Sequence, residues 1–127
     1  MKKILVIGAG GQIGSDLIPI LRKKYGNDNV ISAGYENDLP SYIKDNGPHT
    51  YIDVRNKKQI EQVICQYNIN TIFNLASILS ALAEKKLLLS YEVNFTGLIN
   101  VLEASKENNV KQVILVSSIA AFGSYTP

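Results

Sequence analysis

Residues Lys3–Gly14, KILVIGAGGQIG, contain the pattern that decides the fold. The apolar run Ile4–Ile7 predicts a strand that is buried on both faces, as in a parallel sheet. Gly8, Gly11 and Gly14 follow at once, and an amphipathic helical pattern follows them. Glycine can adopt the backbone angles of a tight turn, and it lets a ligand approach the main chain closely. The order of strand, glycine turn and helix therefore predicts an anion site at the N-terminus of the helix.

The spacing of these glycines is G-x-x-G-x-x-G, because Ile13 stands where the tighter G-x-G-x-x-G would need its last glycine. No Lys-Ser or Lys-Thr pair follows the glycines, which excludes a P-loop that reaches a terminal phosphate or holds magnesium. The usual occupant of such a turn is the pyrophosphate of a dinucleotide. A plain tight turn before a helix is the alternative, but the order of strand, motif and helix favours cofactor binding.

The composition is that of one globular domain. The chain has 127 residues, 46% of them hydrophobic, and a formal net charge of +2. The lysines are dispersed, so the chain has no basic footprint for nucleic acid. A single cysteine, Cys65, excludes an internal disulfide, and no apolar run approaches the ~20 residues that span a bilayer. The start Met-Lys-Lys-Ile enters the glycine turn too soon for a signal peptide, so we expect a cytoplasmic protein without a membrane or nucleic-acid partner.

Strand and helix patterns alternate along the rest of the chain. Further strands are predicted at residues 29–34, 51–54, 71–76 and 112–116. Helices are predicted after the glycines, with a kink at Pro19, after a capping Asn56, and over about residues 81–105, where Gly97 indicates close packing. Residues 36–48 are polar and predict a surface loop. This alternation predicts an α/β fold with a doubly wound parallel sheet of order 3-2-1-4-5 and a ligand across the carboxyl ends of strands one and four.

The end of the second strand decides which dinucleotide fits. In dinucleotide folds an acidic residue there binds the ribose hydroxyls of the adenosine. This chain has Gly34-Tyr35 at that place, with Glu36 and Asp38 just beyond. The choice between NAD and NADP is therefore open on this feature, although no Arg or Lys stands nearby in the sequence to receive a 2′-phosphate, which favours NAD.

Together these residues resemble the extended short-chain dehydrogenase/reductase superfamily, which includes nucleotide-sugar epimerases and dehydratases. The resemblance covers the whole chain and implies a Rossmann-type fold. Within the superfamily, the segments Ile78-Leu79-Ser80-Ala81 and Ser117-Ser118-Ile119-Ala120 are similar to those of the epimerase-related L-threonine 3-dehydrogenases. These enzymes oxidise threonine to 2-amino-3-oxobutanoate with NAD. The motifs that carry the wider resemblance are the glycine turn, Asp53-Val54, Asn74-Leu75-Ala76-Ser77, Val93-Asn94-x-x-Gly97 and Ser117-Ser118.

The resemblance implies a role for each of these motifs. The backbone at Gly11, Gln12 and Ile13, between Gly8 and Gly14, would hold the pyrophosphate. Asp53 and Val54 would flank the adenine. Leu75, Ala76 and Ser77 would line the path toward the nicotinamide, and Asn94 belongs to the cofactor-binding set. Ser118, or Ser117 if the register differs by one, would bind the reacting oxygen. Ser80 would lie near the substrate, although a cap or turn is an equal explanation of that serine. No metal is implied.

Three departures from the family pattern stand out. Gly34 replaces the usual acidic residue, and Asn74 replaces a usual histidine. None of the seven tyrosines is followed four residues later by a lysine, so the Tyr-x-x-x-Lys pair of the superfamily is absent from this chain. We therefore expect residues 1–127 to be the N-terminal dinucleotide-binding part of such an enzyme, incomplete at the C-terminus, without the catalytic helix and the substrate domain, and inactive alone.

The function expected from the resemblance is NAD-dependent oxidation of a small molecule, L-threonine above all, by a full-length family member that is a homodimer. Nucleotide-sugar epimerisation or dehydration is the alternative, since it uses the same cofactor site. A non-catalytic dinucleotide-binding module is an alternative of another class.

Overall fold

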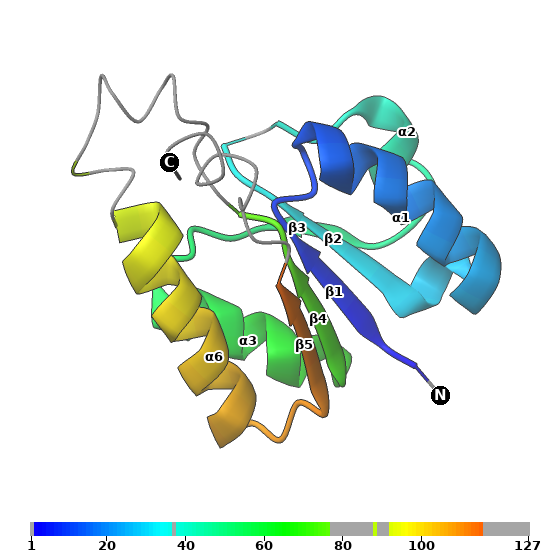
Figure 1. Cartoon of the computed structure of the whole chain (residues 1–127). Coiled ribbons are helices and arrows are strands. Elements are labelled where there is room, and N and C mark those ends of the chain that lie inside the picture. The colour runs from blue at the N-terminus through cyan, green and yellow to red at the C-terminus, as the bar shows by residue number, and fades with distance from the viewer. Residues whose placement is uncertain (1, 37, 77–87, 89–91, 116–127) are drawn as a thin grey trace, which may run out of the picture.

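The computed structural model describes residues 2–36, 38–76, 88 and 92–115. Strands and helices alternate along these residues, as the sequence predicts (Figure 1). The elements in chain order are β1 (Ile4–Ile7), α1 (Gln12–Tyr25), a 3-10 turn η1 (Asn27–Asn29), β2 (Val30–Gly34), α2 (Ser41–Lys44), β3 (His49–Tyr51), α3 (Lys57–Tyr67), β4 (Thr71–Asn74), a π-helical turn η2 (Glu92–Thr96), α6 (Gly97–Glu107) and β5 (Gln112–Leu115).

The strands form one parallel sheet of order β3-β2-β1-β4-β5, which confirms the predicted α/β fold of the Rossmann type. Ile7, the last residue of β1, lies opposite Ala33 of β2 and opposite Asn74 of β4. The carboxyl ends of the central strands therefore share one edge of the sheet. The segments that follow β1, β2 and β4 all start from that edge.

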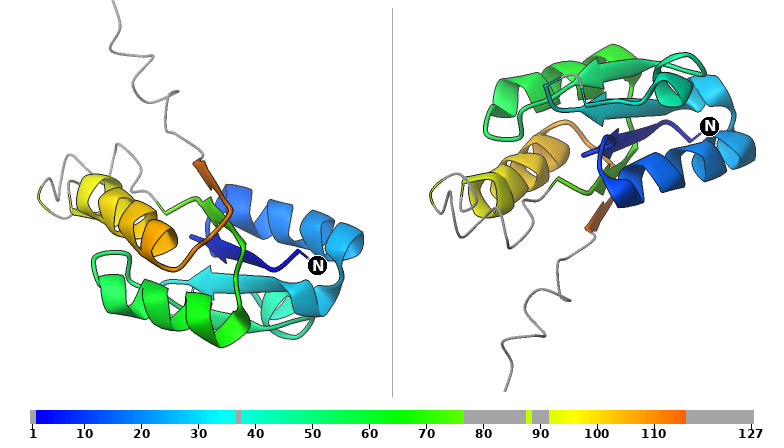
Figure 2. Two further views of the ribbon diagram at one scale, coloured as in Figure 1. Left: turned by 90° about the horizontal axis from the view of Figure 1, so that it is seen from below. Right: turned by 90° about the horizontal axis from the view of Figure 1, so that it is seen from above.

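Helices cover both faces of the sheet (Figure 2). Successive side chains of a strand point to opposite faces, and in β1 all four are buried. Ile4 and Val6 pack in one cluster with residues of α1 and α2, whereas Leu5 and Ile7 pack in the other with residues of α3 and α6. Burial on both faces explains why the strand is a continuous apolar run rather than an alternating one.

Helix α1 continues through Pro19. Proline lacks the N–H group that would bond to the carbonyl four residues earlier, which here belongs to Ser15. The Tyr42 hydroxyl donates a hydrogen bond to that Ser15 carbonyl at 3.2 Å. The Tyr42 hydroxyl of α2 thus takes the place of the N–H donor that Pro19 lacks.

The buried Arg22 ties α1 to the segment that links β2 and β3. Its side chain is only 5% exposed, and its guanidinium donates to the carbonyls of Ile43 at 2.8 Å and Pro48 at 3.1 Å and to the Ser32 hydroxyl at 3.1 Å. Burial lowers the pKa of Arg22 from its ordinary value. These bonds fix the course of the chain after β2, which enters the site described below.

The prediction of a surface loop at residues 36–48 is wrong in part. Residues Ser41–Lys44 form the one-turn helix α2, and both Leu39 and Ile43 are buried in the cluster beneath α1. Leu39 precedes the N-cap Pro40 and Ile43 lies within the turn, so the start of this turn brings both side chains to the same apolar cluster. The apolar contact of this turn with α1 outweighs the polar character of its neighbours.

The predicted strand boundaries also shift. Strand β3 comprises His49–Tyr51 instead of residues 51–54, because β2 ends at Gly34 opposite Tyr51 and only the Ile52 N–H reaches back to the Gly34 carbonyl. Strand β2 begins at Val30, since residue 29 belongs to η1, and β4 ends at Asn74. Within the range predicted as one helix, the described part divides into η2 and α6. In the described part of the chain, no helix is long and apolar enough to span a membrane.

Candidate functional site

Two glycines of the turn after β1, Gly8 and Gly14, are required because the main chain itself packs against them. Gly8 has φ +81, and a Cβ on it would lie 2.7 Å from the main chain of Leu75 and Ala76. A Cβ on Gly14 would lie 2.6 Å from the Gly8 carbonyl oxygen. These two glycines let β1, β4 and α1 approach one another, so they are required even without a ligand.

Gly11, unlike Gly8 and Gly14, has room for a side chain. A Cβ on it would have one neighbour, the Gly8 carbonyl oxygen at 3.5 Å, which is an ordinary contact. Gly11 is the N-cap of α1, and neither a capping side chain nor an acidic residue lies in the first turn of that helix. Free N–H groups and the positive end of the helix dipole therefore face outward at Gln12 and Ile13, as an anion site requires. The space in front of Gly11 is open to the pocket described next.

A pocket of about 210 Å³ opens beside this turn. It lies at the carboxyl edge of the sheet and receives residues from the segments after four of the strands. Its lining contains six of the predicted cofactor-binding residues, Gly8, Gly11, Asp53, Val54, Leu75 and Ala76, together with Ile7, Tyr35, Asp38, Ile52 and Val93. The sequence therefore predicts most of the wall of this pocket.

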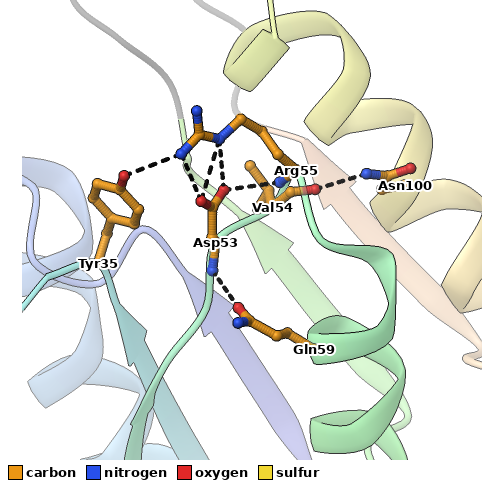
Figure 3. Close-up of polar contacts among 6 residues, drawn as sticks. All are labelled: Tyr35, Asp53, Val54, Arg55, Gln59 and Asn100. Atoms are coloured by element: carbon orange, nitrogen blue, oxygen red, sulfur yellow. Dashed lines mark hydrogen bonds and ion pairs between the residues drawn. The ribbon is translucent and has the colours of Figure 1, made fainter. Parts of the chain in front are cut away.

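One end of the pocket carries a charged network (Figure 3). Arg55 donates from Nε to Asp53 Oδ1 at 2.9 Å and from one terminal nitrogen to Asp53 Oδ2 at 2.6 Å. The same terminal nitrogen donates to the Tyr35 hydroxyl at 3.2 Å. The hydrogen bonds from Arg55 lower the pKa of Asp53, and those to Asp53 raise the pKa of Arg55. Burial, followed by the Glu36 charge, raises the pKa of Tyr35.

This network corrects one expectation from the sequence. No cation stands near Gly34 along the chain, but the fold brings Arg55 to the neighbouring Tyr35. Asp53 and Arg55 meet because residues 53–56 form a turn, in which the Asn56 N–H donates to the Asp53 carbonyl at 2.9 Å and the Arg55 N–H donates to Asp53 Oδ1 at 3.0 Å. The guanidinium is already bound to both oxygens of Asp53, so its charge is compensated within the site.

Val54 is held in place by α6. The Asn100 side-chain amide donates to the Val54 carbonyl at 2.9 Å (Figure 3), and Gly97 packs so closely on Val54 that a Cβ there would clash with the Val54 side chain. This contact confirms the close packing that Gly97 predicts. The main-chain N–H of Asp53 donates to the Gln59 side chain at 2.8 Å, so α3 supports the same segment from the other side.

Asn74 has a structural role where the resembled family has histidine. Its side chain is 7% exposed, and its Oδ1 accepts a hydrogen bond from the Ala76 N–H at 3.3 Å. The amide thereby shapes the turn that carries Leu75 and Ala76 into the pocket.

The remaining predicted residues divide into two groups. Gln12, Ile13 and Gly14 form the first turn of α1 next to the pocket, and Asn94 lies in η2 beside the pocket residue Val93. Ser77, Ser80, Ser117 and Ser118 lie outside the described residues. Among the described residues, no group of three or more His, Cys, Asp or Glu side chains is placed to hold a metal ion.

The fold agrees with the comparisons. Residues 4–127 match the model of the NAD dependent epimerase/dehydratase family, and the chain belongs to that family. An uncharacterized epimerase/dehydratase of Staphylococcus epidermidis is 39% identical over all of this chain, which spans 40% of that relative. The chain thus corresponds to about two-fifths of the length of such curated relatives.

Two solved structures extend the comparison. The L-threonine dehydrogenase of Clostridium difficile superimposes with a TM-score of 0.82 and 41% identity, over 88% of this chain and 35% of that one. The UDP-glucose 4-epimerase of Thermus thermophilus, solved in complex with NAD, gives a TM-score of 0.72 and 24% identity over 87% of this chain and 36% of that one. The second likeness is one of fold alone.

Proposed function

We propose that this chain is the dinucleotide-binding part of an NAD-dependent oxidoreductase that converts L-threonine to 2-amino-3-oxobutanoate. The pocket at the carboxyl edge of the sheet carries this proposal. Its wall includes Gly11 at the uncapped start of α1, Asp53 and Val54 after β3, and Leu75 and Ala76 after β4. An elongated ligand with an anionic centre and two flat ends fits such a surface.

The residues present fit NAD, and the family resemblance implies which of them would bind each part of it. Main-chain N–H groups of Gln12 and Ile13 bind the pyrophosphate, and the absence of a side chain on Gly11 allows its approach. Asp53 and Val54 flank the adenine, while Leu75 and Ala76 lead toward the nicotinamide. When bound, NAD supplies the acceptor for the hydride of the substrate.

The roles nearest the chemistry belong to serines outside the described residues. Ser77 continues the path toward the nicotinamide, where Asn94 of η2 completes the cofactor site, and Ser80 contacts the substrate. Ser118, or Ser117 in a shifted register, donates a hydrogen bond to the reacting oxygen. A serine hydroxyl orients that oxygen but is a poor base without an activating partner.

The choice of substrate rests on likeness. The L-threonine dehydrogenase of C. difficile shares 41% identity with this chain, compared with 24% for the UDP-glucose 4-epimerase of T. thermophilus. The staphylococcal relative is named an uncharacterized epimerase/dehydratase, and nucleotide-sugar epimerisation or dehydration is the second candidate. A dinucleotide-binding module without catalysis is the third. For the threonine enzyme we propose a homodimer, as the resemblance implies.

Calorimetric titration of the chain with NAD tests the cofactor site. We expect one molecule of NAD per chain with a micromolar Kd. Gly11→Ala is the matched variant, because the added methyl group finds room within the protein but occupies the space in front of the helix terminus. We expect it to weaken NAD binding about tenfold, or ~1.4 kcal/mol, with an unchanged circular dichroism spectrum. A folded chain that binds no NAD would contradict the proposal.

A chimera tests whether this chain can serve as the dinucleotide-binding part of a threonine dehydrogenase. Residues 1–127 replace the corresponding part of the C. difficile L-threonine dehydrogenase, so that the remaining part of that enzyme supplies the groups that this chain lacks. Threonine-dependent NADH formation is expected, with a loss of about 10²–10⁴-fold in the Ser118→Ala chimera. The isolated chain should form no NADH. A chimera that binds NAD but forms no NADH from threonine contradicts the threonine assignment. Activity in the matching chimera with the T. thermophilus UDP-glucose 4-epimerase then supports the second candidate, and NAD binding without activity in either chimera supports the third.

A further inference from the structure

The end of β2 lacks the carboxylate that a dinucleotide site normally presents there. Strand β2 ends at Gly34, which is buried and has no side chain. The chain then turns back on itself: the Tyr35 N–H donates to Asp38 Oδ1 at 2.7 Å, and the Asp38 N–H donates to the Tyr35 carbonyl at 3.2 Å. This turn returns a carboxylate, that of Asp38, to the strand end.

Two glycines make room for that carboxylate. A Cβ on Gly34 would clash with Asp38 Oδ1, and a Cβ on Gly10 would clash with the whole Asp38 carboxyl group. Gly10 belongs to the turn after β1, so the Asp38 carboxylate lies between the two strand ends where the ribose of an adenosine passes. An acidic side chain on residue 34 itself could not coexist with this arrangement.

Asp38 faces the pocket and is free to accept more hydrogen bonds. Its side chain is exposed and lines the pocket with Gly11 and Tyr35. A carboxylate offers about four acceptor positions, and the Tyr35 N–H takes one of them. Vicinal ribose hydroxyls are donors that match the remaining positions.

The charges around this point disfavour a phosphate. Arg55, which reaches Tyr35 from the far side, is bound by both oxygens of Asp53. Glu36 and Asp38 add two further carboxylates beside Tyr35. A 2′-phosphate on the ribose would therefore meet negative charge at close range, which costs binding free energy.

We propose that Asp38 is the residue that binds the adenosine ribose hydroxyls and excludes NADP. Asp38 thus takes the role that an acidic residue at position 34 would have, four residues later in the chain. The absence of side chains at Gly34 and Gly10 leaves room for the Asp38 carboxylate. The inference rests on the proposed dinucleotide site and names the residue that sets its specificity.

Titrations of the chain with NAD and with NADP test this role in the Asp38→Asn variant. Asparagine keeps an oxygen that can accept from the Tyr35 N–H, so the turn survives, while the negative charge and one strong acceptor are lost. We expect NAD binding to weaken about 10–100-fold, the range for a hydrogen bond to a charged group. NADP binding should strengthen, so that the preference for NAD collapses. Asp28→Asn, which removes an exposed acid in η1 before the start of β2, is the matched control and should leave both affinities within about twofold.

The outcomes separate this inference from the proposed function. If the unmodified chain binds neither dinucleotide, the proposed function fails. If it binds NAD and Asp38→Asn changes neither affinity, or if it prefers NADP from the start, the role of Asp38 is wrong while the dinucleotide site stands. A structural role of Asp38 alone would weaken NAD and NADP equally, which also overturns the assignment.

Discussion

Asp53 is held as a carboxylate by its neighbour Arg55. Both oxygens accept from the guanidinium, and Oδ1 also accepts from the Arg55 main-chain N–H at 3.0 Å. The side chains are partly exposed, at 28% for Asp53 and 31% for Arg55, so solvent weakens the attraction between their charges. The effect of the pair is therefore expected on the ionisation of Asp53 more than on overall stability.

The Arg55→Gln variant is expected to raise the pKa of Asp53 toward its ordinary value of ~3.9. In the folded protein the pKa lies below that value, so the stabilising contribution of Asp53 is present above pH ~3.9 and is lost as the pH falls through the folded-state pKa. Carboxyl-carbon NMR through an acid titration measures this change. Lys57→Gln is the control, because Lys57 pairs with Glu107, and it should leave the pKa of Asp53 unchanged. An Asp53 pKa that Arg55→Gln fails to move would contradict the assignment.

The structural role of a single residue was predictable from the sequence where it depends on main-chain conformation or on the absence of a side chain. The glycine pattern locates the turn, and Gly97 predicts a close contact that is found at Val54. Tyr35 and Arg55 were missed because their meeting depends on how two segments, 20 residues apart in the chain, leave neighbouring strands. The carboxylate of Asp38 reaches the strand end only through a turn that includes Glu36 at φ +51, and sequence spacing does not predict that turn.

Helix α3 begins at the capping residue that the sequence indicates. Asn56 Oδ1 accepts from the Gln59 N–H at 3.4 Å, and the Gln59 side chain accepts from the Asp53 N–H at 2.8 Å. The cap therefore links the start of the helix to the segment that lines the pocket. The other end stops at Asn68, which adopts φ +53, a left-handed conformation that asparagine tolerates.

Asn56→Ala is expected to lower the free energy of unfolding by about 1 kcal/mol, because it leaves an N–H of the first turn without its side-chain acceptor. For a domain of this size that corresponds to a fall in Tm of roughly 4 °C. Urea and thermal denaturation followed by circular dichroism measure both quantities. Asn56→Asp keeps the acceptor and should remain close to the unmodified chain. If the two variants are equally destabilised, the cap contributes nothing at this position.

Elements with a strong period were predicted better than short ones. The strand of residues 4–7 and the helix over Ile60, Val63 and Ile64 carry continuous or four-residue patterns, and both are found. The one-turn helix α2 rests on a single apolar pair, Leu39 and Ile43. The third strand was displaced because its length is set by where β2 ends, a pairing that its own residues do not encode.

At the scale of the molecule, the order of the strands follows from the alternation of strands and helices, since right-handed crossovers leave few arrangements. That order, with all strands parallel, brings the ends of β1, β2 and β4 to one edge and predicts where the pocket lies. The support of the pocket by α6 was only partly predictable. Gly97 indicates a close approach, but the approaching partner is 43 residues earlier in the chain and is known only from the fold.

Gly97→Ala is expected to weaken NAD binding and stability together, because the new methyl group displaces the Val54 side chain that lines the pocket. Overpacking of this kind costs about 1–3 kcal/mol, whereas alanine in a helix is intrinsically favoured over glycine by ~1 kcal/mol. A net loss of stability would therefore report the clash and not the helix.

The double variant Gly97→Ala/Val54→Ala isolates the contact. Truncation of Val54 removes the atoms that the new methyl group meets, so the double variant should be more stable than the sum of the single effects by about 1 kcal/mol or more. Urea denaturation gives the stabilities of all four proteins, and NAD titration of the same set shows whether the coupling extends to the site. Additive effects on stability would mean that Gly97 does not pack against the Val54 side chain, and that α6 supports this part of the pocket wall through the Asn100 hydrogen bond alone.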